Sequence, residues 1–228
     1  MHYNAMRHAK LFFETYCSDP TVDLSVVEIG SYNVNGSLKD VITPNVKKYT
    51  GVDFSPGPGV DVILTDPYHF PFADNTFDVL VTSSCFEHSE LFWLTFLESL
   101  RILKPNGIMY CNTPSAWMCY HQFPVDCWRF YPDSARALET WACRNKLSTM
   151  VLESYISTPS APGECADMVG VFLKDKSYQN LYPNRTIDRL TPHQDYVNAF
   201  RFPITQQFPN GWSYPSAAAP MGVQHPLS

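Results

Sequence analysis

The chain has 228 residues, 45% of them apolar and 17% charged, which allows a buried core and excludes a highly charged disordered protein. Its net charge of -6 and the lack of any Lys/Arg run argue against nucleic-acid binding. No stretch approaches the roughly 18 apolar residues that span a bilayer, and the N-terminus has no apolar signal core. We therefore expect a soluble, cytoplasmic protein.

The predicted elements start with a leading helix over residues 4–17. A strand over 25–29, the first turns of a helix over 37–42, a second strand ending in TGVDF, a third strand VDVIL and a fourth strand FDVLVTSS follow. Residues 90–107 carry large apolar side chains at helical spacing and end with Pro105 and Gly107, which predicts an amphipathic crossover helix. A fifth strand over 107–113, a helix over 131–145 and strands over 148–156 and 167–175 complete the pattern.

The strands are nearly continuous apolar runs, which is typical of parallel strands that are covered on both faces. We predict an α/β fold, a Rossmann-like doubly wound sheet of seven strands with an antiparallel terminal strand. The fold is expected to occupy residues 1–176, and residues 177–228 to form a Pro-rich C-terminal extension. The seven cysteines are scattered, odd in number and free of CxxC pairs, so we expect reduced thiols rather than a disulfide framework or a zinc knuckle.

Polar residues follow the strands in turn. In an open parallel sheet, ligands bind beyond the carboxyl ends of the strands, so these residues are candidates for a common site. They are Glu28 and Gly30, then Asp53, then Asp66, then Ser83 to His88, then Asn112 to Ser115. Asp53 lies where an acid can accept hydrogen bonds from a ribose diol, and Gly30 lets the backbone approach a ligand.

The stretches VVEIG, YTGVDFSPGPGVD, DPYHFPFADNTFDVLVTSSCFEHSE and LRILKPNGIMYCNTPS resemble the successive motifs of class I S-adenosylmethionine-dependent methyltransferases, of the methyltransferase type 11 kind. The resemblance covers about residues 25–115 and implies S-adenosyl-L-methionine as cofactor and S-adenosyl-L-homocysteine as product. It also implies an insertion at about 113–132 over the acceptor pocket. The first loop departs from the family, because Tyr32 replaces a usual glycine.

The resemblance implies cofactor contacts along the strand ends. Glu28 and Gly30 would lie around the methionine part, Asp53 would bind the ribose hydroxyls, Asp66 and Pro67 would lie at the adenine, and Ser83 or Ser84 would line the methionyl side. Ser31 and Phe54 are further cofactor-binding candidates. Asp78 is expected to be structural.

Methyl transfer to a hydroxyl needs in-line positioning and a base. His88, His121 and Asp126 are the candidate bases. Glu87 and His88 could equally open the crossover helix, and His121 and Asp126 could equally make hydrogen bonds within their loop.

The sequence allows a divalent metal but does not favour one. FEH resembles the metal motif E-x-x-E-H of RNA 2′-O-methyltransferases, but Ser84 occupies the first Glu position.

The stretch from 117 to 131 is rich in aromatic residues and also carries charged ones, a combination that suits a sugar. Trp117, Tyr120, Trp128 and Arg129 are the candidate substrate-binding residues. PVDCWRFYPDS resembles a stretch in methyltransferases of glycan-assembly clusters.

The leading hypothesis is an O-methyltransferase acting on a sugar hydroxyl of a glycan or glycan precursor. The alternatives are methylation of another small-molecule hydroxyl or amine, and a non-catalytic binding module that keeps the fold. Homodimer formation is compatible with the sequence. The acceptor, the oligomeric state and whether the chain is a fragment are not fixed by the residues.

Overall fold

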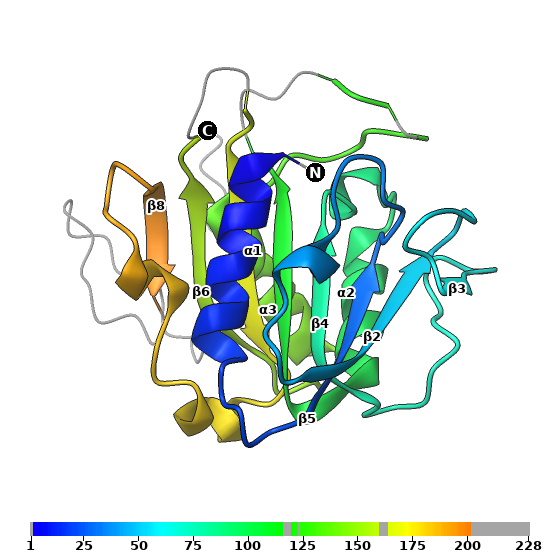
Figure 1. Ribbon diagram of the computed structural model, residues 1–228, viewed down its shortest axis with the longest axis horizontal. Coiled ribbons are helices and arrows are strands. Elements are labelled where there is room, and N and C mark those ends of the chain that lie inside the picture. The colour runs from blue at the N-terminus through cyan, green and yellow to red at the C-terminus, as the bar shows by residue number, and fades with distance from the viewer. Residues whose placement is uncertain (1, 116–119, 123, 160–163, 202–228) are drawn as a thin grey trace, which may run out of the picture.

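The computed structural model describes residues 2–115, 120–122, 124–159 and 164–201 (Figure 1). They form one mixed sheet with the strand order β3-β2-β1-β4-β5-β7-β6-β8. The strands are β1 (Leu24–Ile29), β2 (Val46–Asp53), β3 (Val62–Ile63), β4 (Phe77–Ser83), β5 (Leu103–Pro114), β6 (Met150–Ser157), β7 (Asp167–Leu173) and β8 (Tyr196–Arg201). The first five strands are parallel, whereas β7 is antiparallel to both of its neighbours, β5 and β6. The predicted α/β sheet with late antiparallel pairing is confirmed.

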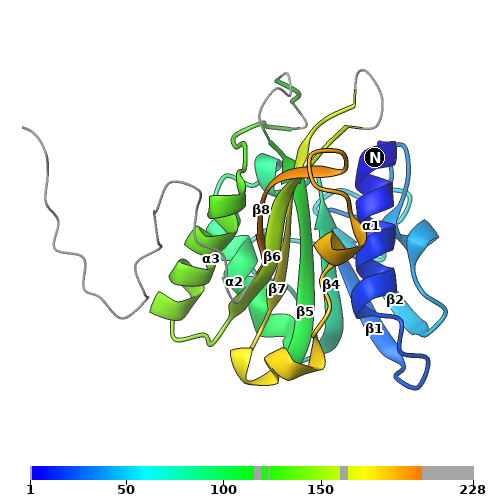
Figure 2. The same ribbon diagram turned by 90° about the vertical axis from the view of Figure 1, so that its left-hand side faces the viewer.

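Helices cover both faces of the sheet (Figure 2). They are α1 (Tyr3–Tyr16), α2 (Phe92–Ile102) and α3 (Pro132–Arg144). On one face α1 buries Phe12 and Phe13 against Tyr110 of β5. On the other face Phe96 of α2 and Leu138 of α3 belong to a second apolar core. The sheet is therefore buried on both sides, as the continuous apolar runs of its strands require.

The sheet has eight strands rather than the seven predicted. β8 pairs antiparallel with β6, and two 3₁₀ turns, Lys176–Leu181 and Thr186–Arg189, lead to it. The chain after 176 is thus part of the fold as far as Arg201. β8 carries no fully buried residue, so its sequence YVNAFR shows no continuous apolar run.

Three predicted elements have different bounds. The helix expected over 37–42 is a single 3₁₀ turn, Leu38–Val41, because Pro44 follows too soon for a longer helix. The predicted third strand is paired only over Val62–Ile63. The crossover helix α2 ends at Ile102 rather than at Pro105, because β5 already starts at Leu103.

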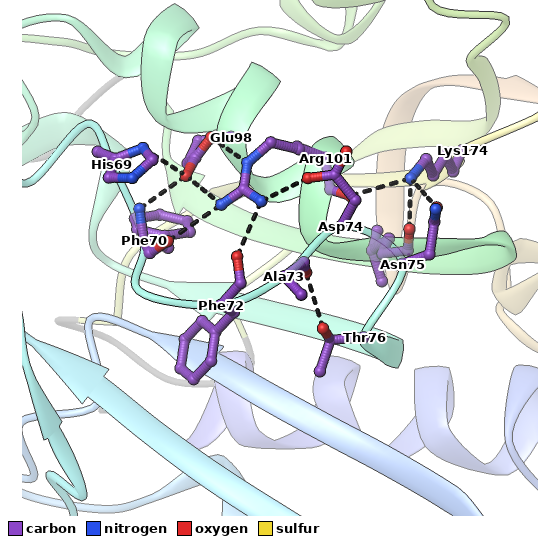
Figure 3. A network of polar contacts seen from close by, with 11 residues as sticks. His69, Phe70, Phe72, Ala73, Asp74, Asn75, Thr76, Glu98, Arg101 and Lys174 are labelled. Carbon is purple, nitrogen blue, oxygen red and sulfur yellow. Dashed lines mark hydrogen bonds and ion pairs between the residues drawn. The ribbon is translucent and has the colours of Figure 1, made fainter.

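The stretch FPFADNTFDV is held by two basic side chains (Figure 3). Arg101 of α2 donates to the carbonyls of Phe70 and Phe72 and pairs with Glu98 and Asp74. Lys174 donates to Asn75 Oδ1 and to the carbonyl of Arg101 (Figure 3). This motif therefore has a structural role, since its polar contacts fix the approach to β4.

Asp78 is structural, as expected. Its Oδ2 accepts hydrogen bonds from the backbone and the hydroxyl of Ser25, and its Oδ1 pairs with Lys104. These contacts join the N-terminal ends of β1, β4 and β5. The candidate site lies at the opposite, C-terminal ends of the strands.

The six described cysteines are free thiols. None of the described helices has both the length and the apolar character needed to cross a lipid bilayer.

Candidate functional site

The turn after β1 is built around Gly30. Its φ of +80° is in the left-handed region that favours glycine. A Cβ on Gly30 would lie 2.7 Å from Cys85 Cβ and 2.9 Å from Cys85 Sγ. The sequence suggested that glycine makes room here for a ligand, whereas the structure shows that it makes room for Cys85. The turn after β1 therefore contacts the turn after β4 directly.

Asp53 ends β2 as a buried carboxylate, with the residue 7% exposed. Its Oδ2 accepts a hydrogen bond from the backbone N–H of Tyr32, and its Oδ1 accepts one from the N–H of Ser55. Each carboxylate oxygen has a second lone pair. The carboxylate is therefore fixed in place and can still accept hydrogen bonds from a diol.

The loop after β1 packs against the loop after β2. The Tyr32 ring lies against Gly57, where a Cβ would be 2.2 Å from the ring, and the Asn33 N–H donates to the Pro58 carbonyl. Ser31 is buried beside Gly51 and Gly59 on the same side. Residues 31–33 thus form a loop that is held by its neighbour.

Glu28 is buried in β1 and accepts a hydrogen bond from the Tyr49 hydroxyl at 2.7 Å. Burial raises the pKa of Glu28 from 4.5 to about 7, although the Tyr49 bond opposes the shift. The Glu28 carboxyl group therefore gains or loses its proton near neutral pH.

The remaining cofactor candidates lie at the strand ends with different exposure. Phe54 is half exposed beside Asp53, and Asp66 and Pro67 are exposed, with Asp66 Oδ1 accepting from the Tyr68 N–H. Ser83 is buried and donates to Asn112 Oδ1. Ser84 is exposed at a φ of +51°, and its N–H donates to the Asn112 carbonyl. The structure places all of these residues at or just after the strand ends where the sequence predicted them.

The turn after β4 carries a cluster that we call the Glu87 cluster: Glu87, His88, His121 and Asp126. Glu87 is not part of α2, because it lies in a separate 3₁₀ turn, Phe86–His88. Its side chain is 0% exposed, and among the described residues neither carboxylate oxygen accepts a hydrogen bond. His88 Nε2 lies 3.7 Å and His121 Nε2 4.0 Å from Glu87 Oε1. The rings of the two histidines meet edge to face at 5.0 Å.

Burial changes the protonation of this cluster. It raises the pKa of Glu87 to about 8 and lowers the pKa of His88 below its ordinary value. Both shifts disfavour the charged forms.

Asp126 links the insertion to the Glu87 cluster. Its side chain is 1% exposed, accepts from the His121 N–H at 2.7 Å, and lies 3.5 Å from His121 Nδ1. The Arg129 guanidinium binds both carboxylate oxygens and holds the pKa of Asp126 well below its usual range. The Cys127 N–H donates to the Glu87 carbonyl, which fastens the insertion to the 3₁₀ turn.

The sequence places Glu87 with His88 at the end of the fourth strand, next to the expected methyl site, but Glu87 is not among the candidate bases. Its position directly after a buried strand was the available signal, but its contact with His121 depends on the path of the insertion.

The candidate acceptor residues differ in exposure. Tyr120 is 70% exposed, whereas Trp128 packs edge to face against Phe92 and donates from its indole N–H to the Ser89 carbonyl. Phe130 is a core residue. Trp117 lies outside the described residues. Among the described candidates for substrate binding, Tyr120 therefore has the most exposed aromatic ring.

Residues 28–111 match a family model described as a methyltransferase domain. No curated protein matches the chain by sequence.

Several solved structures share the fold. They include the Burkholderia thailandensis 1,6-didemethyltoxoflavin-N1-methyltransferase with bound S-adenosylhomocysteine, at a TM-score of 0.59, 14% identity, and coverage of 75% of this chain and 79% of that chain. A chain from the complex of the Haloferax volcanii Trm112 methyltransferase activator with a protein described as a methyltransferase has a TM-score of 0.55, 16% identity and coverages of 76% and 90%. The [4+2]-cyclase SpnF has a TM-score of 0.53, 15% identity and coverages of 75% and 81%. At these identities the likeness concerns the fold.

The site is compatible with S-adenosylmethionine. The Asp53 carboxylate is fixed by two backbone N–H groups and can accept two further hydrogen bonds, as a ribose diol requires. The half-exposed Phe54 beside it offers an aromatic face to a planar base. The family model that matches residues 28–111 is a methyltransferase domain, and the chain shares its fold with solved methyltransferases.

Proposed function

We propose that the protein is an S-adenosylmethionine-dependent O-methyltransferase that transfers a methyl group to a sugar hydroxyl of a glycan or glycan precursor. One observation carries this proposal: the contact between Gly30 and Cys85. It puts the turn after β1, where the methionine part of the cofactor is expected, beside the turn that carries Glu87 and His88. A methyl donor and a group of proton-handling side chains can therefore share one site.

The chain's own residues would orient the two reactants. Asp53 would accept the ribose hydroxyls, Asp66 and Pro67 would contact the adenine, and Glu28, Gly30 and Ser31 would surround the methionine part. Ser83 and Ser84 would line the methionyl side. The sulfonium supplies an electrophilic methyl group, so the protein contributes mainly in-line positioning.

The acceptor's proton is handled by the Glu87 cluster in this proposal. As the new O–C bond forms and the C–S bond breaks, the hydroxyl proton leaves by way of the His88–His121 pair to water. Asp126 is a positioning residue rather than the base, because Arg129 binds both of its oxygens and lowers its pKa.

A sugar acceptor is supported by the mixture of groups around the Glu87 cluster. Tyr120 presents an exposed ring, and Trp128 remains 37% exposed. Aromatic faces bind the C–H faces of sugars, and adjacent charged groups bind their hydroxyls.

A small-molecule amine is the second candidate, because the Burkholderia protein of similar fold is a 1,6-didemethyltoxoflavin-N1-methyltransferase, which methylates a nitrogen. An amine acceptor needs less help from a base. The double variant His88→Asn/His121→Asn should therefore lose most of its activity on a hydroxyl and retain most of it on an amine.

The test is calorimetric titration with S-adenosylmethionine, followed by a screen of methyl transfer onto mono- and oligosaccharides with NMR of the product. We expect binding and a methyl ether on one sugar hydroxyl. Binding without transfer to any acceptor would favour a binding module or another reaction, since SpnF shares the fold and is named a cyclase. Absence of binding would refute the methyltransferase proposal.

A further inference from the structure

Neither oxygen of the buried Glu87 carboxylate accepts a hydrogen bond from another residue that the structure describes. Its side chain is 0% exposed. An isolated buried carboxylate is very costly unless a cation or several donors compensate it, so buried acids are usually paired or bound to a metal. The groups that face Glu87 Oε1 are the Nε2 atoms of His88 and His121. These atoms are metal-ligand atoms as well as donors.

We propose that Glu87, His88 and His121 bind a divalent first-row transition-metal ion, with Zn²⁺ as the first candidate. One ligand atom from each residue lies within 4.8 Å of the other two. Ligand atoms around a tetrahedral zinc ion are about 3.4 Å apart, given metal–ligand distances of about 2.1 Å. The two separations from Glu87 Oε1, 3.7 and 4.0 Å, are close to this value, and the third lies within 4.8 Å, so closing around an ion requires each pair to approach by at most about 1.4 Å.

The orientation of both imidazoles supports this site. His88 Nδ1 is hydrogen-bonded to the Val125 carbonyl, which can only accept, so Nδ1 carries the proton and Nε2 presents its lone pair to Glu87. His121 Nδ1 faces Asp126 at 3.5 Å, and Arg129 fixes Asp126. A carbonyl or carboxylate behind each imidazole is the arrangement that orients metal-ligating histidines in proteins.

The ligand set indicates the kind of ion. Two imidazole nitrogens and one carboxylate favour zinc and similar transition metals, whereas Mg²⁺ and Ca²⁺ prefer oxygen ligands. Three protein ligands leave at least one coordination position open. With the ion bound, the two Nε2 lone pairs would be occupied, so a hydroxyl at the open position would pass its proton directly to water instead of through the histidine pair, and more readily because the cation stabilises the alkoxide. This role rests on the proposed methyl transfer, whereas the binding of the ion does not.

The test is a titration of the full chain, first dialysed against a chelator, with Zn²⁺ in a calorimeter and with Co²⁺ in a spectrophotometer. We expect one ion per chain, a visible d–d spectrum from Co²⁺ and a higher melting temperature with Zn²⁺. Glu87→Gln and His121→Asn should each weaken Zn²⁺ binding at least tenfold, and Asp126→Asn about 10- to 100-fold through the orientation of His121.

His69→Asn is the matched control. His69 also lies beside a carboxylate, 3.4 Å from Glu98 Oε1, but its side chain is 74% exposed and it lies outside the Glu87 cluster. Its replacement should leave Zn²⁺ binding unchanged. Glu87→Gln should fold at least as stably as the metal-free protein, because the amide has nearly the same shape and cannot carry a charge in this buried position, and its melting temperature should not rise with Zn²⁺.

Two results would overturn the metal site: no Zn²⁺ binding by the wild-type protein, or equal affinity in wild type and Glu87→Gln. If Zn²⁺ binds at the Glu87 cluster but no acceptor is methylated, the metal site stands and the proposed function fails. If methyl transfer is unchanged after the metal is stripped, the catalytic role of the ion is refuted while the site remains.

Discussion

The backbone N–H of Tyr32 donates to Asp53 Oδ2 at 3.1 Å, so the last residue of β2 fixes the loop that follows β1. The Tyr32 ring in turn lies against Gly57 in the loop after β2. Cofactor contacts proposed for the two loops are therefore mechanically coupled.

Replacing Asp53 by Asn should weaken the binding of S-adenosylmethionine about 10- to 100-fold, because charged hydrogen bonds contribute about 1.5–3 kcal/mol. The measurement is calorimetric titration. Asp23→Asn serves as the control, because Asp23 is an exposed acid that directly precedes β1, at the end of the strand away from the candidate site. Equal affinities for Asp53→Asn and wild type would exclude the ribose role.

Replacing Gly30 by Ala should destabilise the fold by about 2–4 kcal/mol. The new Cβ would meet Cys85 at 2.7 Å, and Ala would also have to adopt a φ of +80°. Urea denaturation measures the loss. Cys85→Gly on the Gly30→Ala background should recover the part that comes from the clash, and a double-mutant cycle separates it from the backbone strain. Strict additivity of the two substitutions would show that the contact with Cys85 is not the cause.

Glu28 should make stability depend on pH. Its folded-state pKa of about 7 is above its ordinary value of 4.5, so the folded protein holds this proton more tightly than the unfolded chain. Its contribution is most favourable at low pH and declines as the pH rises from 4.5 to about 7, by about 3 kcal/mol in total.

Glu28→Gln lacks this titration. The variant should therefore gain stability relative to wild type between pH 5 and pH 8, as measured by urea denaturation at each pH. Parallel pH profiles for the two proteins would contradict the assignment.

Arg101 should be a large contributor to the stability of the loop before β4. Arg101→Ala should lower the free energy of unfolding by about 2–3 kcal/mol, because it leaves the Glu98 carboxylate, only 10% exposed, without its cation and two carbonyls without their donor. Thermal and urea denaturation measure the effect. Arg144→Ala, at the exposed end of α3, is the matched control, and a loss of similar size there would refute the network's contribution.

Much of the fold could be predicted because the strands are continuous apolar runs. This pattern predicts β1, β4 and β7. The polar residues after each strand predict that the candidate site lies at the C-terminal ends of the strands. β8 could not be predicted from an apolar run, because it is the outermost strand of the sheet and has no fully buried position.

The Glu87 cluster could be predicted only in part. His88, His121 and Asp126 are predicted from residue type and position, but His121 follows His88 by 33 positions in the chain. Their contact depends on the hydrogen bond from Cys127 to the Glu87 carbonyl, a backbone interaction that no side-chain pattern reveals.

Residues 185–201 limit how far the chain can be truncated from its C-terminal side. The buried Glu153 of β6 accepts hydrogen bonds from the backbones of Thr186 and Ile187 and from the hydroxyl of Tyr16. A chain ended at Lys176 would leave this carboxylate with one donor instead of three and would open the edge of β6 to other strands. Any truncation of the protein that aims at a stable folded core should therefore retain the chain through Arg201.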